Sequence, residues 1–174
     1  MTKLDGHTVS LRALEPEDLE FLFEAENNTS FWKMSDTQTP FSKYVLKQYL
    51  ENAHLDIYQA KQFRFIIEEK LNQKAVGMID LFDFNPQHQR VGVGILIHQL
   101  YQNNGFASEA LALLIEYCFE ILLIHQLYAN ISVDNHKSIA LFKKHAFQEV
   151  GIKKEWIKSP DGFKDEILYQ LIKK

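Results

Sequence analysis

Hydrophobic and polar residues alternate in seven short segments of the chain, which is the pattern of half-buried β-strands. Asn85-Pro86 lies between two of them and is typical of a turn, so residues 75–84 and 89–98 are expected to pair as an antiparallel hairpin. A second turn is predicted over residues 159–162, Ser-Pro-Asp-Gly. The seven predicted strands cover residues 8–12, 62–69, 75–84, 89–98, 126–133, 148–158 and 163–173.

Apolar residues recur at helical spacing in four of the segments between these strands. Residues 27–41 instead mix Asn, Ser, Thr and Pro with bulky apolar residues, which favours a loop or a broken helix that still packs. The resulting order, β-α-α-β-β-β-α-β-α-β-β, predicts an α/β fold formed by one domain, residues 1–174. The predicted helices begin after Pro16, after Ser42, near Asn104 and after Asp134-Asn135.

The strand over residues 89–98 carries Gly92 and Gly94 on one face and branched apolar residues on the other. Glycine weakens a strand, so two glycines in alternation indicate a bulge or a close approach by another chain or a ligand. A bend at the edge of the sheet explains them equally well, and both explanations stay open.

Composition narrows the class of protein. A net charge of −4 argues against a nucleic-acid partner, which needs a basic surface, and agrees with a cationic substrate. Cys118 is the single cysteine, which excludes an internal disulfide and a cysteine-based zinc cage. Residues 107–127 are rich in apolar residues but contain three glutamates, too many charges for a membrane span. Since the start of the sequence also lacks an apolar leader, we expect a cytoplasmic protein without a membrane partner.

Residues 102–107, Gln-Asn-Asn-Gly-Phe-Ala, lie between a strand and the longest predicted helix. The first turn of a helix offers unpaired backbone N–H groups and the positive end of the helix dipole. Gly105 leaves room for an anion there and Ala107 is small, so the segment suits a pyrophosphate. An ordinary strand-to-helix turn is the alternative. The glycine pattern matches neither the dinucleotide-binding fingerprint nor a phosphate loop.

Four motifs in order resemble the GNAT acetyltransferases, most closely the branch of ribosomal-protein N-terminal and spermidine acetyltransferases. RVGVGILI (90–97) resembles the strand that pairs with the pantetheine arm of coenzyme A, QNNGFA (102–107) the pyrophosphate turn, and SEALALLIEYCF (108–119) its helix. NISVDNHKSIALFKKHAF (130–147) resembles the family's N-x-x-S-x-x-L-[YF]-x-x-x-G-F segment. The resemblance implies a mixed, mostly antiparallel twisted sheet of about seven strands with about four helices. It also implies a splayed parallel strand pair at the acetyl-CoA site, and acetyl transfer to a primary amine.

The resemblance further implies which residues hold acetyl-CoA, the co-substrate, and no metal is expected. Ile95 and Ile97 would offer backbone groups to the pantetheine arm, and Asn135 would hydrogen-bond the same arm. Phe142 would pack against the cofactor. The remaining contacts would come from Gln102, Asn104, Gly105, Phe106 and Ala107 at the pyrophosphate, and from Ser138 and Lys144 nearby.

Phe142 departs from the tyrosine that many relatives carry, whose hydroxyl protonates the departing thiolate. Phenylalanine has no proton to give, so the acid is water or another group, with Tyr101, Tyr128 and Tyr169 as candidate substitutes. Ala146 stands where the family commonly has glycine, a change expected to affect the end of the helix and not the cofactor site.

Asp80 and Asp83 are the candidate bases that would take a proton from the amine, directly or through water. They belong to the strand beside the splayed one, and solvated carboxylates near a turn are the alternative for each. An ideal strand places residues three apart on opposite faces, so at most one is expected to reach the site. Asp83 aligns with an acidic position in polyamine-acetylating relatives.

Four further residues have a possible functional role and a structural alternative. Cys118 lies on the apolar stripe of its helix, which predicts a buried core thiol and not a nucleophile. His88 is a candidate base, with a surface position as the simpler explanation. Trp32 and Trp156 are candidate walls of the acceptor pocket, with packing as the alternative.

The sequence favours a small amine or a protein N-terminus as acceptor, acetylated by direct attack in a ternary complex. A polyamine such as spermidine is the alternative; it favours clustered carboxylates, whereas residues 30–36 hold one lysine and one aspartate. A non-catalytic acyl-coenzyme A sensor is the alternative of another class, supported by Phe142. Formation of a homo-oligomer stays open.

Overall fold

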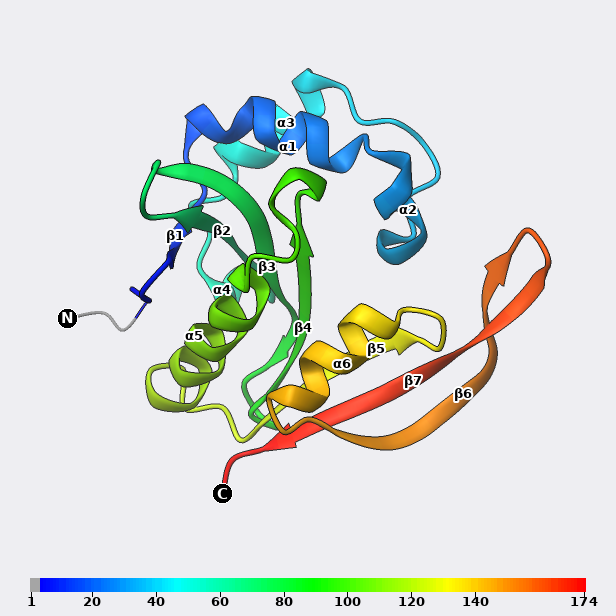
Figure 1. Cartoon of the computed structure of the whole chain (residues 1–174). Helices are drawn as coiled ribbons and strands as arrows, with labels where there is room; N and C mark the ends of the chain where they lie inside the picture. The colour runs from blue at the N-terminus through cyan, green and yellow to red at the C-terminus, as the bar shows by residue number, and fades with distance from the viewer. Residues whose placement is uncertain (1–3) are drawn as a thin grey trace.

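A computed structural model describes residues 4–174 of the chain, with one seven-stranded mixed sheet at its centre (Figure 1). The strand order is β1-β2-β3-β4-β5-β7-β6, and of these neighbouring pairs only β4 and β5 run parallel. The α/β fold class and the seven predicted strands are confirmed. The strands are β1 (Val9–Ala13), β2 (Phe63–Glu69), β3 (Lys74–Asn85), β4 (Arg90–Ile97), β5 (Gln126–Ser132), β6 (Gln148–Ser159) and β7 (Gly162–Ile172).

The described residues form six α-helices, against about four expected from the sequence. The two additional helices are short: α2 lies in the segment expected to be a loop or broken helix, and α4 is a single turn. Each begins at a side-chain cap, because Asn28 accepts a hydrogen bond from the N–H of Ser30 and Asp56 from that of Gln59. The helices are α1 (Leu19–Glu26), α2 (Thr29–Ser35), α3 (Lys43–Glu51), α4 (Ile57–Ala60), α5 (Phe106–Glu120) and α6 (His136–Lys144), with 3-10 turns η1 (Pro16–Asp18) and η2 (Gln99–Tyr101).

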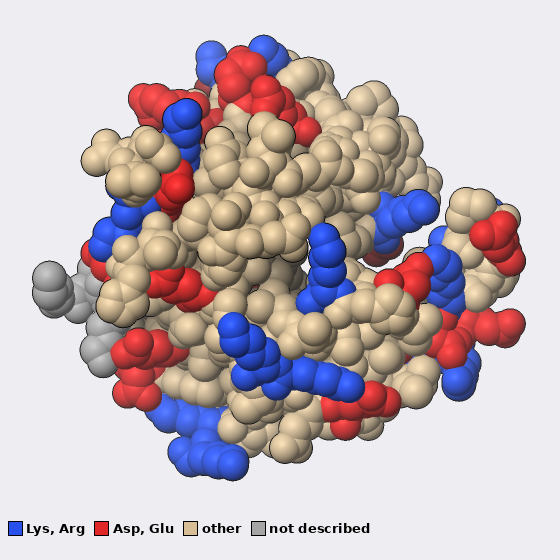
Figure 2. Space-filling view, in the orientation of Figure 1, with Lys and Arg blue, Asp and Glu red and all other residues tan. Residues whose placement is uncertain are grey.

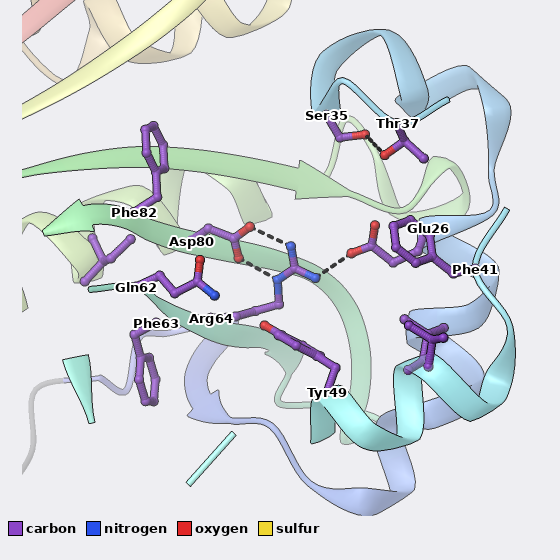
Figure 3. Close-up of a pocket in the computed structure, with 13 residues that line it drawn as sticks. Glu26, Ser35, Thr37, Phe41, Tyr49, Gln62, Phe63, Arg64, Asp80 and Phe82 are labelled. Atoms are coloured by element: carbon purple, nitrogen blue, oxygen red, sulfur yellow. Dashed lines mark hydrogen bonds and ion pairs between the residues drawn. The ribbon is translucent and has the colours of Figure 1, made fainter. Parts of the chain in front are cut away.

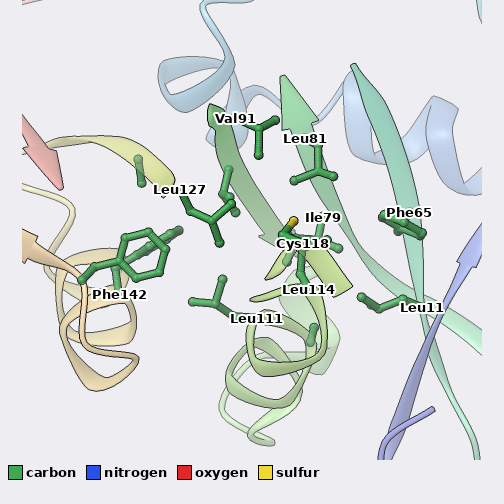
Figure 4. Close-up of a cluster of buried hydrophobic side chains, with 14 of the residues drawn as sticks. Leu11, Phe65, Ile79, Leu81, Val91, Leu111, Leu114, Cys118, Leu127 and Phe142 are labelled. Atoms are coloured by element: carbon green, nitrogen blue, oxygen red, sulfur yellow. The ribbon is translucent and has the colours of Figure 1, made fainter. Parts of the chain in front are cut away.

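Apolar side chains cover both faces of the sheet. On one face α5 packs Leu111, Leu114 and Cys118, all fully buried, against the alternate residues of the central strands (Figure 4). On the other face α1 and α3 form a smaller cluster with Ile66 and Met78. Since successive residues of a strand point to opposite faces, Asp80 and Phe82 lie on the same face as Met78. The sheet therefore has one face under α5 and α6 and a second face under α1 and α3.

The parallel pair β4 and β5 separates part-way along its length. Only Arg90, Val91 and Gly92 of β4 pair with β5, and Gly92–Tyr128 is the last pair. Both strands continue beyond it without pairing to each other, β4 to Ile97 and β5 to Ser132. The splayed pair that the sequence implied is therefore present, and it leaves backbone groups of both strands facing a gap.

The two glycines of β4 have different surroundings. A Cβ atom on Gly92 would overlap the ring of Phe82, which lies over this residue. A Cβ atom on Gly94 would meet nothing closer than a Phe82 ring carbon at 4.0 Å. The close approach that the sequence left open is therefore real at Gly92, and the chain that approaches is the neighbouring β3.

We predict that Gly92→Ala lowers the free energy of unfolding by about 1–3 kcal/mol, because the Phe82 ring must move to admit the methyl group. Gly94→Ala is the matched control in the same strand and is expected to change this free energy by less than about 0.5 kcal/mol. Urea denaturation of both variants measures the difference. Equal effects of the two substitutions would contradict the close packing of the Phe82 ring over Gly92.

Candidate active site

A cavity of about 480 Å³ lies between β4, the start of α5 and α6. The residues expected to hold the cofactor line it, except Asn104 and Phe142. From β4 and the turn after it come Ile95, Ile97, Gln102, Gly105, Phe106 and Ala107, and from α6 and its cap come Asn135, Ser138 and Lys144.

The N-terminus of α5 opens into this cavity. Gly105 is its N-cap and has a φ of 80°, a left-handed conformation that glycine adopts without strain. A Cβ atom here would meet nothing within 4 Å, so the space beside the first N–H groups of α5 is free for a ligand. Free backbone donors, the helix dipole and open space together fit the diphosphate of a coenzyme A molecule.

Gln102 and Asn104 have different roles in the folded chain. The amide of Gln102 donates to the carbonyl oxygen of Ile97 at 3.1 Å and its oxygen accepts from Lys137 at 3.3 Å, so Gln102 joins β4 to α6. Asn104 donates to the carbonyl oxygens of Tyr101 and Gln102 and does not line the cavity. Asn104 therefore shapes the turn, and the neighbouring Asn103 lines the cavity in its place.

Further residues of the cavity wall were not predicted from the sequence. Phe31 and Met34 reach it from α2, and the amide of Asn135 donates to the sulfur of Met34 at 3.3 Å. The bulky apolar residues among polar ones in residues 27–41 were the available signal. Lys137 adds a second positive charge beside Lys144, and basic side chains gather over α6 (Figure 2). This side of the cavity suits a polyanionic ligand.

Phe142 does not contact the cavity, contrary to the expectation from the sequence. It is 3% exposed and packs edge-on against Phe147, with 4.9 Å between ring centroids. Figure 4 shows its ring between α6 and the sheet, on the side of Leu127. Ser138 and Leu141 are three residues apart and lie on the face of α6 that lines the cavity, whereas Phe142 lies on the face that packs into the core.

A second cavity, of about 380 Å³, lies over β2 and β3 beneath the N-terminal helices. Arg64 lies at its centre between two carboxylates: Asp80 binds it through both oxygens at 2.7 Å, and Glu26 binds it at 2.5 Å (Figure 3). Burial lowers the pKa of Arg64, but Asp80 and Glu26 outweigh it and the net shift is upward, so the guanidinium stays charged. Two carboxylates and one guanidinium give the cluster a net charge of −1.

The strand containing the two candidate bases is not regular. Two residues of β3, Asp83 and Phe84, lie opposite one residue of β4 between Phe82 and Asn85, and Asp83 has a φ of 49°. This bulge breaks the alternation, so the expectation that Asp80 and Asp83 lie on opposite faces does not apply. Both oxygens of Asp80 are occupied by Arg64, whereas no hydrogen bond or ion pair of Asp83 is found within residues 4–174.

Tyr128 pairs with Gly92 at the closed end of the gap between β4 and β5. Its ring packs edge-on against Phe82, with 5.9 Å between centroids. Burial and the charge of Asp83 raise the pKa of the Tyr128 phenol, and Arg90 opposes them. The phenol therefore stays protonated at neutral pH.

Comparisons with known proteins agree with this geometry. The family model of the acetyltransferase (GNAT) domain matches residues 8–148. Spermidine N(1)-acetyltransferase of Escherichia coli (strain K12) is 30% identical over 149 residues, which cover 84% of this chain and 76% of that protein. The crystal structure of spermidine N-acetyltransferase from Vibrio cholerae in complex with CoA and spermine has a TM-score of 0.86 at 25% identity, covering 95% of both chains. A dodecameric structure of the Vibrio cholerae enzyme has a TM-score of 0.79 at 28% identity, covering 95% of this chain and 94% of that one.

The chain belongs to the GNAT acetyltransferases. It is an enzyme that transfers an acetyl group from acetyl-CoA to an amine, as the four sequence motifs implied. These relatives support the spermidine part of the expected branch, and they give no support to the ribosomal-protein part.

The other candidate residues line neither of the two cavities. Cys118 is fully buried, and burial raises the pKa of its thiol to about 12, so it is a core residue and not a nucleophile. His88 is exposed in the β3–β4 turn. Trp32 donates to the carbonyl oxygen of Glu26 and lines neither cavity, and Trp156 is 62% exposed on β6.

No three His, Cys, Asp or Glu side chains among residues 4–174 lie close enough together to hold a metal ion. None of the described helices has the length and apolar character needed to cross a membrane.

We predict that Gly105→Glu weakens coenzyme A binding at least about 10-fold while the protein stays folded, because a carboxylate then occupies the space beside the helix N-terminus. Gly105→Ala is the matched control: it carries the same left-handed strain, about 1 kcal/mol, without the charge. Calorimetric titration with coenzyme A and a circular dichroism melt measure both effects. An unchanged affinity for coenzyme A in folded Gly105→Glu protein would show that the diphosphate does not bind at this position.

Proposed function

We propose that the enzyme acetylates a primary amine of an aliphatic polyamine, by direct attack of the amine on acetyl-CoA in a ternary complex. The observation that carries the proposal is the negative charge along β3: the cluster of Arg64 with Asp80 and Glu26 has a net charge of −1, and Asp83 adds another. Two negative centres suit an acceptor with ammonium groups at both ends of a short chain. The spermidine acetyltransferases among the relatives support the same class.

Asp83 is the residue we assign as base, and Asp80 is assigned to binding. A thioester is already activated, so the enzyme must align the amine with it and remove a proton. Asp83 has free lone pairs and lies beside the end of the gap between β4 and β5, whereas Asp80 is bound by Arg64 through both oxygens. The cofactor contacts proposed on the other face are those of the cavity-lining residues, from Ile95 to Lys144.

A singly charged small amine or a protein N-terminus is the second candidate acceptor. The observation that favours it is the segment of residues 30–36, where Lys33 and Asp36 balance each other and no cluster of carboxylates forms. The sequence alone favoured this small amine or protein N-terminus over a polyamine. The charges along β3 and the named relatives favour the polyamine instead.

Two further properties are proposed, an oligomeric state and a location. We propose that the chain forms a homo-oligomer, since one of the solved relatives is described as dodecameric. A cytoplasmic location fits a chain whose single cysteine is a buried free thiol.

We expect amine-dependent release of free thiol from acetyl-CoA, with the highest kcat/KM for spermidine or spermine in a panel that includes monoamines, amino acids and N-terminal peptides. Raising the salt concentration should lower kcat/KM more for the polyamines than for the monoamines, because exposed charge pairs are screened. A preference for a monoamine or a peptide would contradict the polyamine proposal and support the second candidate acceptor, a small amine or a protein N-terminus. Coenzyme A binding without turnover of any amine would favour the sensor.

We expect Asp83→Asn to lower kcat at least about 10-fold with little change in coenzyme A affinity, because the amide cannot take the proton. Asparagine tolerates the left-handed backbone at this position, so the bulge is expected to persist. Asp161→Asn, at an exposed aspartate in the turn between β6 and β7, is the control and should keep full activity. A kcat of Asp83→Asn close to that of the unmodified enzyme would assign the base elsewhere.

A further inference from the structure

The reaction needs a proton donor as well as a base, and Phe142 does not supply one. When the amine attacks the thioester carbonyl carbon, the carbon–sulfur bond breaks and its electron pair goes to sulfur, which then takes up a proton. The ring of Phe142 is buried in the core and has no hydroxyl. We propose that Tyr128 donates this proton from the closed end of the gap between β4 and β5.

The position of Tyr128 follows from the pairing of the two strands. The cofactor cavity runs along β4 as far as Ile95, and β4 meets β5 again at Gly92, opposite Tyr128. Three residues of extended chain separate these points, about 10 Å of strand. A pantetheine arm that enters along Ile97 and Ile95 therefore directs its reactive end toward Tyr128.

The ring of Tyr128 is held and its hydroxyl is free. Phe82 packs on it edge-on and itself lies over Gly92, where no side chain displaces it. No hydrogen bond of the Tyr128 hydroxyl is found within residues 4–174, and the residue is partly exposed. Gly94, two residues further along β4, leaves the same face open for the amine. A fixed ring with an unpaired hydroxyl beside an open approach is the arrangement that a proton donor requires.

The other two tyrosines considered from the sequence do not meet these conditions. Tyr101 lines the cofactor cavity at η2, beyond Ile97 and therefore at the far end of the pantetheine path. Tyr169 is fully buried in the core, and its hydroxyl has no hydrogen-bond partner in the part of the chain described.

The proton transfers at Asp83 and Tyr128 balance each other. Asp83 takes one proton from the attacking nitrogen, and Tyr128 gives one proton to the leaving sulfur. The proton on Asp83 then returns to the Tyr128 phenolate, directly or through water, so both residues regain their starting state. The products are the acetylated amine and free coenzyme A. Burial and the charge of Asp83 raise the pKa of the Tyr128 phenol, so the phenol carries its proton before the reaction.

This inference rests on the proposed acetyl transfer, and its test is Tyr128→Phe, which removes one oxygen atom and keeps the ring. We expect kcat to fall about 100-fold, the lower end of the usual contribution of a general acid, while the affinity for coenzyme A stays within about two-fold. Tyr169→Phe, which removes a hydroxyl from the core and touches neither cavity, is the matched control and should keep kcat within about two-fold. All variants are assayed with whichever amine the unmodified enzyme acetylates best, so an error in the acceptor class does not alter the comparison.

A pH profile separates proton donation from a structural effect. A fluorinated tyrosine at position 128 has a lower phenol pKa, so the fall of kcat at alkaline pH should move to lower pH than in the unmodified enzyme. An unmoved alkaline limb, a kcat of Tyr128→Phe within two-fold of the unmodified enzyme, or a loss explained by weaker coenzyme A binding would each overturn the assignment.

Discussion

The active site depends on one interruption in hydrogen bonding: β4 and β5 pair over three residues and then separate. Backbone N–H and C=O groups are costly to leave unpaired when they are removed from water, so strand edges that face a gap need other partners. The carbonyl oxygen of Ile97 already has one, the side-chain amide of Gln102. The remaining edge of β4 is a natural partner for a chain that carries its own amides, as a pantetheine arm does.

The closed end of this gap is held by aromatic packing. Phe82 occupies the space over Gly92 and contacts Tyr128 edge-on, so three adjacent strands are joined on the face that carries Asp80. The bulge of β3 at Asp83 comes directly after Phe82 in the chain, and no ion pair of the Asp83 carboxylate is found within residues 4–174.

Much of this arrangement was accessible from the sequence, because it depends on local periodicity and on motifs of fixed order. The alternation of residues predicted every strand, and the QNNGFA segment predicted the open helix N-terminus at Gly105. What escaped prediction depends on contacts between distant segments. Arg64 is 38 residues from Glu26 and 16 from Asp80, so nothing local shows that Asp80 is already bound. The bulge at Asp83 and the inward direction of Phe142 likewise depend on packing against neighbouring elements.

The two cavities differ in charge. The cofactor cavity carries Lys137 and Lys144 beside a helix N-terminus, whereas the cavity over β3 contains two carboxylates around one arginine. A diphosphate is repelled where an ammonium group is attracted, and the reverse holds on the other side. Residues of α2 line the cofactor cavity through Phe31 and Met34, while Ser35, its last residue, lines the other one. The same short helix therefore contributes to the walls of both cavities.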